Sequence, residues 1–132
     1  MSGISKTLLQ EKFVDQLLNF VKELENLFPN DNKDFKLFSS AVKLVRRTAS
    51  DKYVHNIFMN YVEVYRLKIE NRDESFFLNN DYQEVKKDVQ MDLNSVINKL
   101  KSMWSTLPIT EKNKIWDYFN LLLKLSDTIK RL

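Results

Sequence analysis

The closing stretch EKNKIWDYFNLLLKLSDTIKR, residues 111–131, decides the fold class. Wound as a helix at about 100° per residue, it places apolar side chains over well over half of its circumference. These side chains are Ile115, Trp116, Tyr118, Phe119, Leu121, Leu122, Leu123, Leu125 and Ile129. A helix that is apolar on so many sides has to contact two or more neighbours. We therefore expect a helical bundle with this helix near its centre.

The preceding residues supply the neighbours that this helix needs. Apolar side chains recur at helical spacing in four further segments, and we expect helices over residues 6–28, 33–47, 51–70 and 92–106. Pro29 and Pro108 separate helices, because proline disfavours helical geometry at the residue before it. The sequence thus predicts a single all-α domain over residues 1–132, an irregular bundle of about five main helices (6–28, 33–47, 51–70, 92–106 and 111–131).

The composition argues against several kinds of chemistry. The 132 residues include no cysteine, one glycine and one histidine, His55. Disulfides, cysteine-zinc sites and thiol nucleophiles are therefore excluded, and a glycine-rich phosphate loop cannot be built. We expect His55 to lie at the edge of the core, half packed and half solvated. No apolar run approaches the ~20 residues that span a bilayer. We expect no catalytic residue, metal, cofactor or membrane span.

The stretch DESFFLNNDYQE, residues 73–84, interrupts the helical pattern within the most acidic part of the chain. It does not suit calcium, because phenylalanine stands where oxygen ligands belong and the glycine of the turn is missing. Two interpretations stay open: a hydrophobic latch folded over the third and last helices, or an exposed hook for a partner protein. The hook would consist of Asp73, Glu74, Phe76, Phe77 and Leu78. Because adjacent rings rarely point the same way, we expect one ring buried and its neighbour partly exposed.

The second predicted helix has one basic side. Its positive charges form a stripe with one further cation beside it: Lys33, Lys36, Lys43 and Arg47, with Arg46 adjacent. Its apolar half holds Phe35, Leu37, Phe38, Ala41, Val42, Leu44 and Val45. Such a stripe can follow a phosphate backbone, although a solvated face of an amphipathic helix has the same pattern.

The segment IFMNYVEVYRLKIENRDESFF, residues 57–77, resembles a pattern in small helical proteins of nucleocytoplasmic large DNA viruses. In that pattern, a helix with tyrosine and isoleucine near its end runs into an Asp-Glu-x-Phe-Phe segment. The matching positions are Phe58, Met59, Val62, Tyr65, Ile69, Asp73, Glu74, Phe76 and Phe77. The end of the chain is similar to the closing Ile-Trp-x-Tyr-Leu helix of that group, at Ile115, Trp116, Tyr118 and Phe119.

LFPNDNKDFK, residues 27–36, fits the first helix-to-helix joint of the same group, whereas Ser126 stands near the place of its usual glycine. The resemblance implies a viral protein that acts in infected host cytoplasm or within the virion, and it supplies no catalytic residues. The apolar SFFL segment, residues 75–78, lies in a long acidic connection, and connections of that length are uncommon without a function. From this segment we expect a non-enzymatic protein–protein interaction module that docks onto a viral or host protein. The alternative is a virion structural or genome-associated protein that binds nucleic acid through the basic face of residues 33–47.

Overall fold

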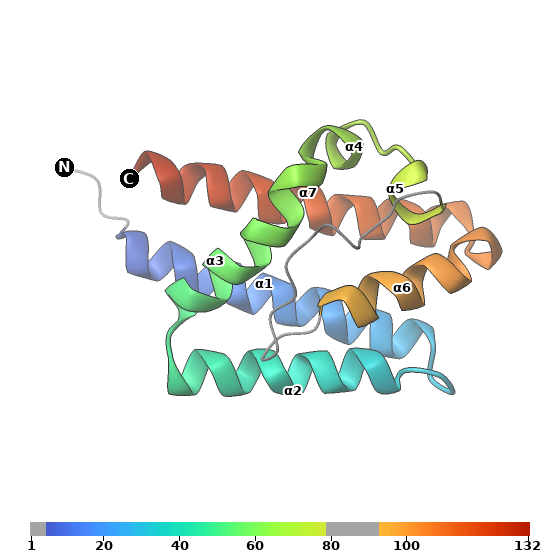
Figure 1. Ribbon diagram of the computed structural model, residues 1–132, viewed down its shortest axis with the longest axis horizontal. Helices are drawn as coiled ribbons and strands as arrows, with labels where there is room; N and C mark the ends of the chain where they lie inside the picture. Colours follow the sequence, from blue (N-terminus) through green and yellow to red (C-terminus); the bar gives the residue numbers. More distant parts are fainter. Residues whose placement is uncertain (1–4, 79–92) are drawn as a thin grey trace.

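The computed structural model describes residues 5–78 and 93–132. All regular structure in these two ranges is helical, which confirms the predicted all-α bundle (Figure 1). The elements are α1 (Lys6–Leu27), α2 (Lys33–Thr48), α3 (Asp51–Val62), the 3-10 turn η1 (Glu63–Tyr65), α4 (Arg66–Glu70), α5 (Ser75–Leu78), α6 (Leu93–Met103), the 3-10 turn η2 (Trp104–Thr106) and α7 (Ile109–Arg131). Their buried apolar side chains form one continuous core.

The bundle is arranged around α1 and α7. Helix α1 packs against α2, α3 and α7, and it lies between α2 and α7 in Figure 1. Helix α7 runs antiparallel to α1 and also packs against α4. The C-terminal helix therefore contacts more than one neighbour, as its apolar circumference predicts.

Two of the predicted helices end earlier than expected. The segment predicted as one helix over residues 51–70 changes to the 3-10 turn η1 after Val62 and continues as α4. The fourth helix ends at Met103 and is followed by η2. Short 3-10 turns of this kind tighten helix ends and redirect the chain. At η1 the redirection brings α4 against α7. The acidic residues beyond position 78, and the predicted first residue of the fourth helix, lie outside the described ranges.

A tight turn leads from α4 into α5. Arg72 has a φ of 51°, the left-handed conformation that usually favours glycine. Its backbone N–H donates to the carbonyl of Ile69 at 3.1 Å, and the N–H of Asp73 donates to the carbonyl of Lys68 at 2.8 Å. These two bonds form the pattern of a Schellman motif at a helix C-terminus. The turn reverses the chain and carries residues 75–78 back onto the bundle.

Candidate functional site

The two adjacent phenylalanines that follow this turn are both buried. Phe76 and Phe77 each have 0% of their surface exposed. The Phe76 ring lies 5.3 Å from the ring of Tyr65 and meets Phe119 edge-on at 5.8 Å. The latch interpretation is therefore correct. The expectation of one partly exposed ring is wrong, and neither ring can contact a partner without leaving the core.

The second ring is buried because α5 lies between two walls of aromatic side chains. Phe77 stacks on Trp104 at 4.1 Å and lies 5.2 Å from Trp116. Adjacent residues of a helix point about 100° apart, so both are buried only where two different elements cover the helix. Here α7 covers the first ring, and η2 together with α7 covers the second. Sequence periodicity alone does not reveal such double coverage.

The other three residues of the predicted hook lie at the surface and have local structural roles or none. The carboxylate of Asp73 accepts a hydrogen bond from the backbone N–H of Ser75 at 2.9 Å, which lowers the pKa of Asp73. Glu74 forms an ion pair with Lys112 at 3.4 Å. Leu78 is 40% exposed. With both rings buried, these residues do not form a continuous binding surface.

His55 is buried and paired with a serine. The residue is 4% exposed, and its Nε2 lies 2.9 Å from Oγ of Ser126, which is fully buried. The Nδ1 atom has no hydrogen-bond partner among the residues that the structure describes, and the ring packs edge-on against Phe13. The prediction of a half-solvated histidine is therefore wrong. Burial makes the Ser–His pair inaccessible to a substrate, and its observed role is a polar contact between α3 and α7.

We expect this histidine to make the fold sensitive to mild acid. Burial first, and then the charges of Lys130 and Lys6, lower the pKa of His55. As the pH falls below about 6.5, His55 is protonated in the unfolded chain but stays neutral in the folded chain. The free energy of unfolding therefore decreases. The His55→Leu variant should lack this component. Urea unfolding at about pH 7.5 and about pH 5.5 measures it. An equal decrease in both proteins would contradict the prediction.

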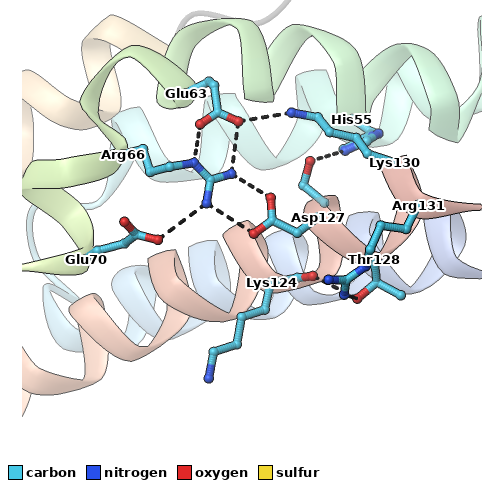
Figure 2. A network of polar contacts seen from close by, with 10 residues as sticks. His55, Glu63, Arg66, Glu70, Lys124, Asp127, Thr128, Lys130 and Arg131 are labelled. Atoms are coloured by element: carbon cyan, nitrogen blue, oxygen red, sulfur yellow. Dashed lines mark hydrogen bonds and ion pairs between the residues drawn. The ribbon is translucent and has the colours of Figure 1, made fainter.

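An ion-pair network next to this pair fastens the bend after α3 to the C-terminal helix. The guanidinium of Arg66 donates to the carboxylates of Glu63, Glu70 and Asp127, and Lys130 also pairs with Glu63 at 3.0 Å (Figure 2). The bond from Arg66 first, together with the one from Lys130, lowers the pKa of Glu63 to about 2. Because each of its carboxylates is paired with a cation, this network binds α4 to α7 rather than forming an open site. Among the described residues, no His, Asp and Glu side chains gather in a group able to hold a metal ion.

A shallow groove runs between α1 and α7, with a volume of about 370 Å³. It is lined by Gln16, Glu23, Lys114, Asp117, Tyr118 and Leu121. Its charges are mixed, and Asp117 already pairs with Arg72. Tyr118 stacks on Phe20 at 5.0 Å in the wall of the bundle. The groove therefore indicates no particular ligand chemistry.

On the outer face of α2, every charged side chain that is exposed is a cation. We define this face as the exposed residues Lys33, Lys36, Leu37, Ser40, Lys43, Leu44, Arg47 and Thr48. It carries four cations and no acidic side chain. None of the four pairs with any residue in the described part of the chain. Helix α2 lies along one edge of the bundle in Figure 1, and the side chains of this face are exposed.

Arg46, also predicted for this surface, is excluded from it. Its guanidinium donates to Asp51 at 2.8 Å and to Asp15 at 3.0 Å, joining α2 to α3 and α1. These two carboxylates raise the pKa of Arg46 further. The predicted basic stripe is thus confirmed as an exposed surface at Lys33, Lys36, Lys43 and Arg47, whereas Arg46 is part of the internal ion pairing.

Two leucines join the cations on the outer face. Leu37 is 59% exposed and Leu44 is 49% exposed, although the sequence assigned both to the apolar half of the helix. They lie at the border of that half. The buried apolar side chains of the helix lie opposite Lys33 and are Phe35, Phe38, Val42 and Val45. The face therefore offers apolar contact area as well as charge. Sequence periodicity does not distinguish these border leucines from core residues.

Comparison of the chain with protein-family models, with curated proteins and with solved structures finds no match. In the described part of the chain, no helix combines the length and hydrophobicity required to cross a membrane. The resemblance to large-DNA-virus proteins remains a prediction.

Proposed function

We propose that this protein is a non-enzymatic interaction module that docks onto a viral or host partner through the outer face of α2. One observation carries the proposal: four exposed cations lie on this face without an acidic partner among the described residues. Like charges three or four residues apart, such as Lys43 and Arg47, destabilise a helix by a few tenths of a kcal/mol. An anionic partner would remove this repulsion and cover the two exposed leucines.

The resemblance noted in the sequence supports the viral origin and the place of action in this proposal. It implies a protein of a large DNA virus, acting in infected cytoplasm or in the virion, where viral and host proteins are both within reach. The buried phenylalanines support the choice of surface, because they leave the acidic segment before α6 without its predicted binding rings.

Neutralising the outer face of α2 should abolish partner capture. The test variant is Lys36→Gln, Lys43→Gln and Arg47→Gln combined. The control variant is Lys52→Gln, Lys101→Gln and Lys124→Gln combined, which removes the same net charge from exposed side chains of α3, α6 and α7. Each protein is used for affinity purification from infected cells, followed by mass spectrometry. We expect the control to retain partners that the test variant loses. Retention of the same partners by both variants would contradict the proposal.

A genome-associated role is the second candidate, and the shape of the cationic stripe favours it. From Lys33 to Arg47 the stripe extends about 21 Å along a straight helix, and the ~12 Å wide major groove of DNA admits a helix. Duplex DNA binding should then weaken steeply with salt, and the α2 test variant should reduce the logarithmic salt slope by about three. Fluorescence anisotropy with a duplex at several salt concentrations measures both. An affinity that the variant leaves unchanged would eliminate this role.

A further inference from the structure

The outer face of α2 has the sequence pattern of one helix of a short two-helix coiled coil. Leu37, Ala41, Leu44 and Thr48 follow one another at alternating intervals of four and three residues. This alternation is the a/d pattern by which two helices pack side by side. Both leucines are exposed, and the small side chain of Ala41 lies half-buried between them. We call these four positions the α2 seam.

Cations lie along one side of the seam only. Lys33 and Arg47 occupy the g positions beside it, and Lys36 and Lys43 lie one row further out. The opposite side of the seam is closed by Phe38 and Val45, which are buried in the bundle. In coiled coils, the charges at the flanking positions determine which helix can pair. The charge arrangement therefore specifies a partner helix that is acidic on the flank facing these cations.

A second copy of this chain offers the seam no acidic flank. In an antiparallel pair, Lys33 would face Arg47 and Lys36 would face Lys43, so cations would meet cations. Like charges juxtaposed across an interface oppose association. The seam therefore favours a different molecule over self-association.

The leucines distinguish among anionic partners. Phosphates and lipid headgroups attract the cations but do not require two leucines at seam spacing, since the phosphate contacts of nucleic-acid binding are electrostatic. A helix that lies on a membrane usually presents a broad apolar face with aromatic residues, and the outer face of α2 carries no aromatic side chain. An amphipathic helix satisfies both features, because its apolar stripe covers the leucines and its carboxylates meet the cations.

We infer that the α2 seam binds an acidic amphipathic α-helix of a partner protein, packed alongside α2 as in a two-stranded coiled coil. This inference rests on the proposed function, because it names the class of partner for the same surface. The contact is expected to depend on the leucines and on the cations together, and salt is expected to weaken its electrostatic part.

The probe is a synthetic peptide of three heptads with leucine at a and d and glutamate at e and g. The matched peptide has lysine at e and g. We expect the glutamate peptide to bind the full chain and the lysine peptide not to bind, measured by fluorescence anisotropy. Leu37→Ser with Leu44→Ser should weaken binding about tenfold or more, since two leucines lose their apolar contacts. The α2 test variant should weaken binding about tenfold at low salt and less at high salt.

Matched variants and competing ligands decide the outcome. Leu121→Ser, at an exposed leucine of α7, should leave peptide binding unchanged. Equal binding of both peptides, or glutamate-peptide binding that survives the paired leucine substitutions, would overturn the inference. Binding of a 20-base-pair duplex or of phosphatidylserine vesicles, without binding of the glutamate peptide, would also overturn it. If partner capture still depends on the α2 cations in that case, the proposed function stands and only the partner class is wrong.

Discussion

Replacing Phe76 and Phe77 by alanine together is expected to unfold the domain. Each ring is completely buried, and removing a buried phenylalanine side chain costs about 3–5 kcal/mol. A domain of this kind has a total free energy of unfolding of about 5–15 kcal/mol, so the two losses consume most or all of it. Circular dichroism and urea unfolding measure the result. The double variant should show little helical signal or a greatly lowered urea midpoint.

Leu78→Ala provides the matched control for this prediction. It alters the same short helix at a residue that is 40% exposed, and it should change the free energy of unfolding by less than about 1 kcal/mol. A double phenylalanine variant as stable as this control would show that α5 does not form part of the core. That result would restore the interpretation of residues 73–78 as an exposed hook.

Replacing Arg66 by glutamine should have the second large effect. The Arg66 side chain is 24% exposed and donates to three carboxylates. Two of them, Glu63 and Glu70, are near it in the sequence, and the third, Asp127, lies on α7. The substitution leaves those carboxylates close together, with Lys130 as the remaining cation on Glu63. We expect the free energy of unfolding at neutral pH to fall by about 2 kcal/mol. Urea unfolding of both proteins measures the difference.

The pH dependence of that difference tests its cause. Glu63 has a pKa of about 2 in the folded protein, well below its ordinary value of 4.5. Its pairing with Arg66 therefore stabilises the fold fully above pH 4.5, and the contribution is lost as the pH falls toward 2. The gap between wild type and Arg66→Gln should narrow over this interval. A gap that stays constant would mean that the loss arises from packing rather than from charge.

Glu70→Gln serves as the control within the same network. Glu70 is 46% exposed and makes the longest of the Arg66 contacts, at 3.4 Å. Exposed ion pairs of this kind contribute about 0–1 kcal/mol. A loss as large as that of Arg66→Gln would show that the network acts as one unit.

The helical architecture was predictable because apolar periodicity is a local signal. The apolar positions of residues 6–28 and 111–131 identify α1 and α7 almost to their observed ends. The change to 3-10 geometry after Val62 was not predictable, since residues 51–70 keep a helical pattern throughout. The bend depends on contacts between α4 and α7, which are far apart in the sequence.

The candidate site was predictable only in part, for a related reason. The wheel of residues 33–47 placed the cations of α2 outward, but it could not show that Arg46 finds carboxylates on α1 and α3. It also assigned Leu37 and Leu44 to the core, because the pattern of a single helix does not show how much of its surface the neighbouring helices cover. The burial of Phe77 likewise depends on Trp104 and Trp116, whose position follows from the packing of η2 and α7.

The shared location of Trp104 and Trp116 gives the protein an internal optical probe. They are the only tryptophans of the chain, and both lie in the aromatic cluster around Phe77. Intrinsic fluorescence therefore reports on the corner where α5, η2 and α7 meet, on the other side of the bundle from α2 in Figure 1. A red shift signals that this corner has opened to water. A ligand that docks on α2 and leaves the corner closed will change anisotropy without changing the emission maximum, so binding and unfolding can be separated in one titration.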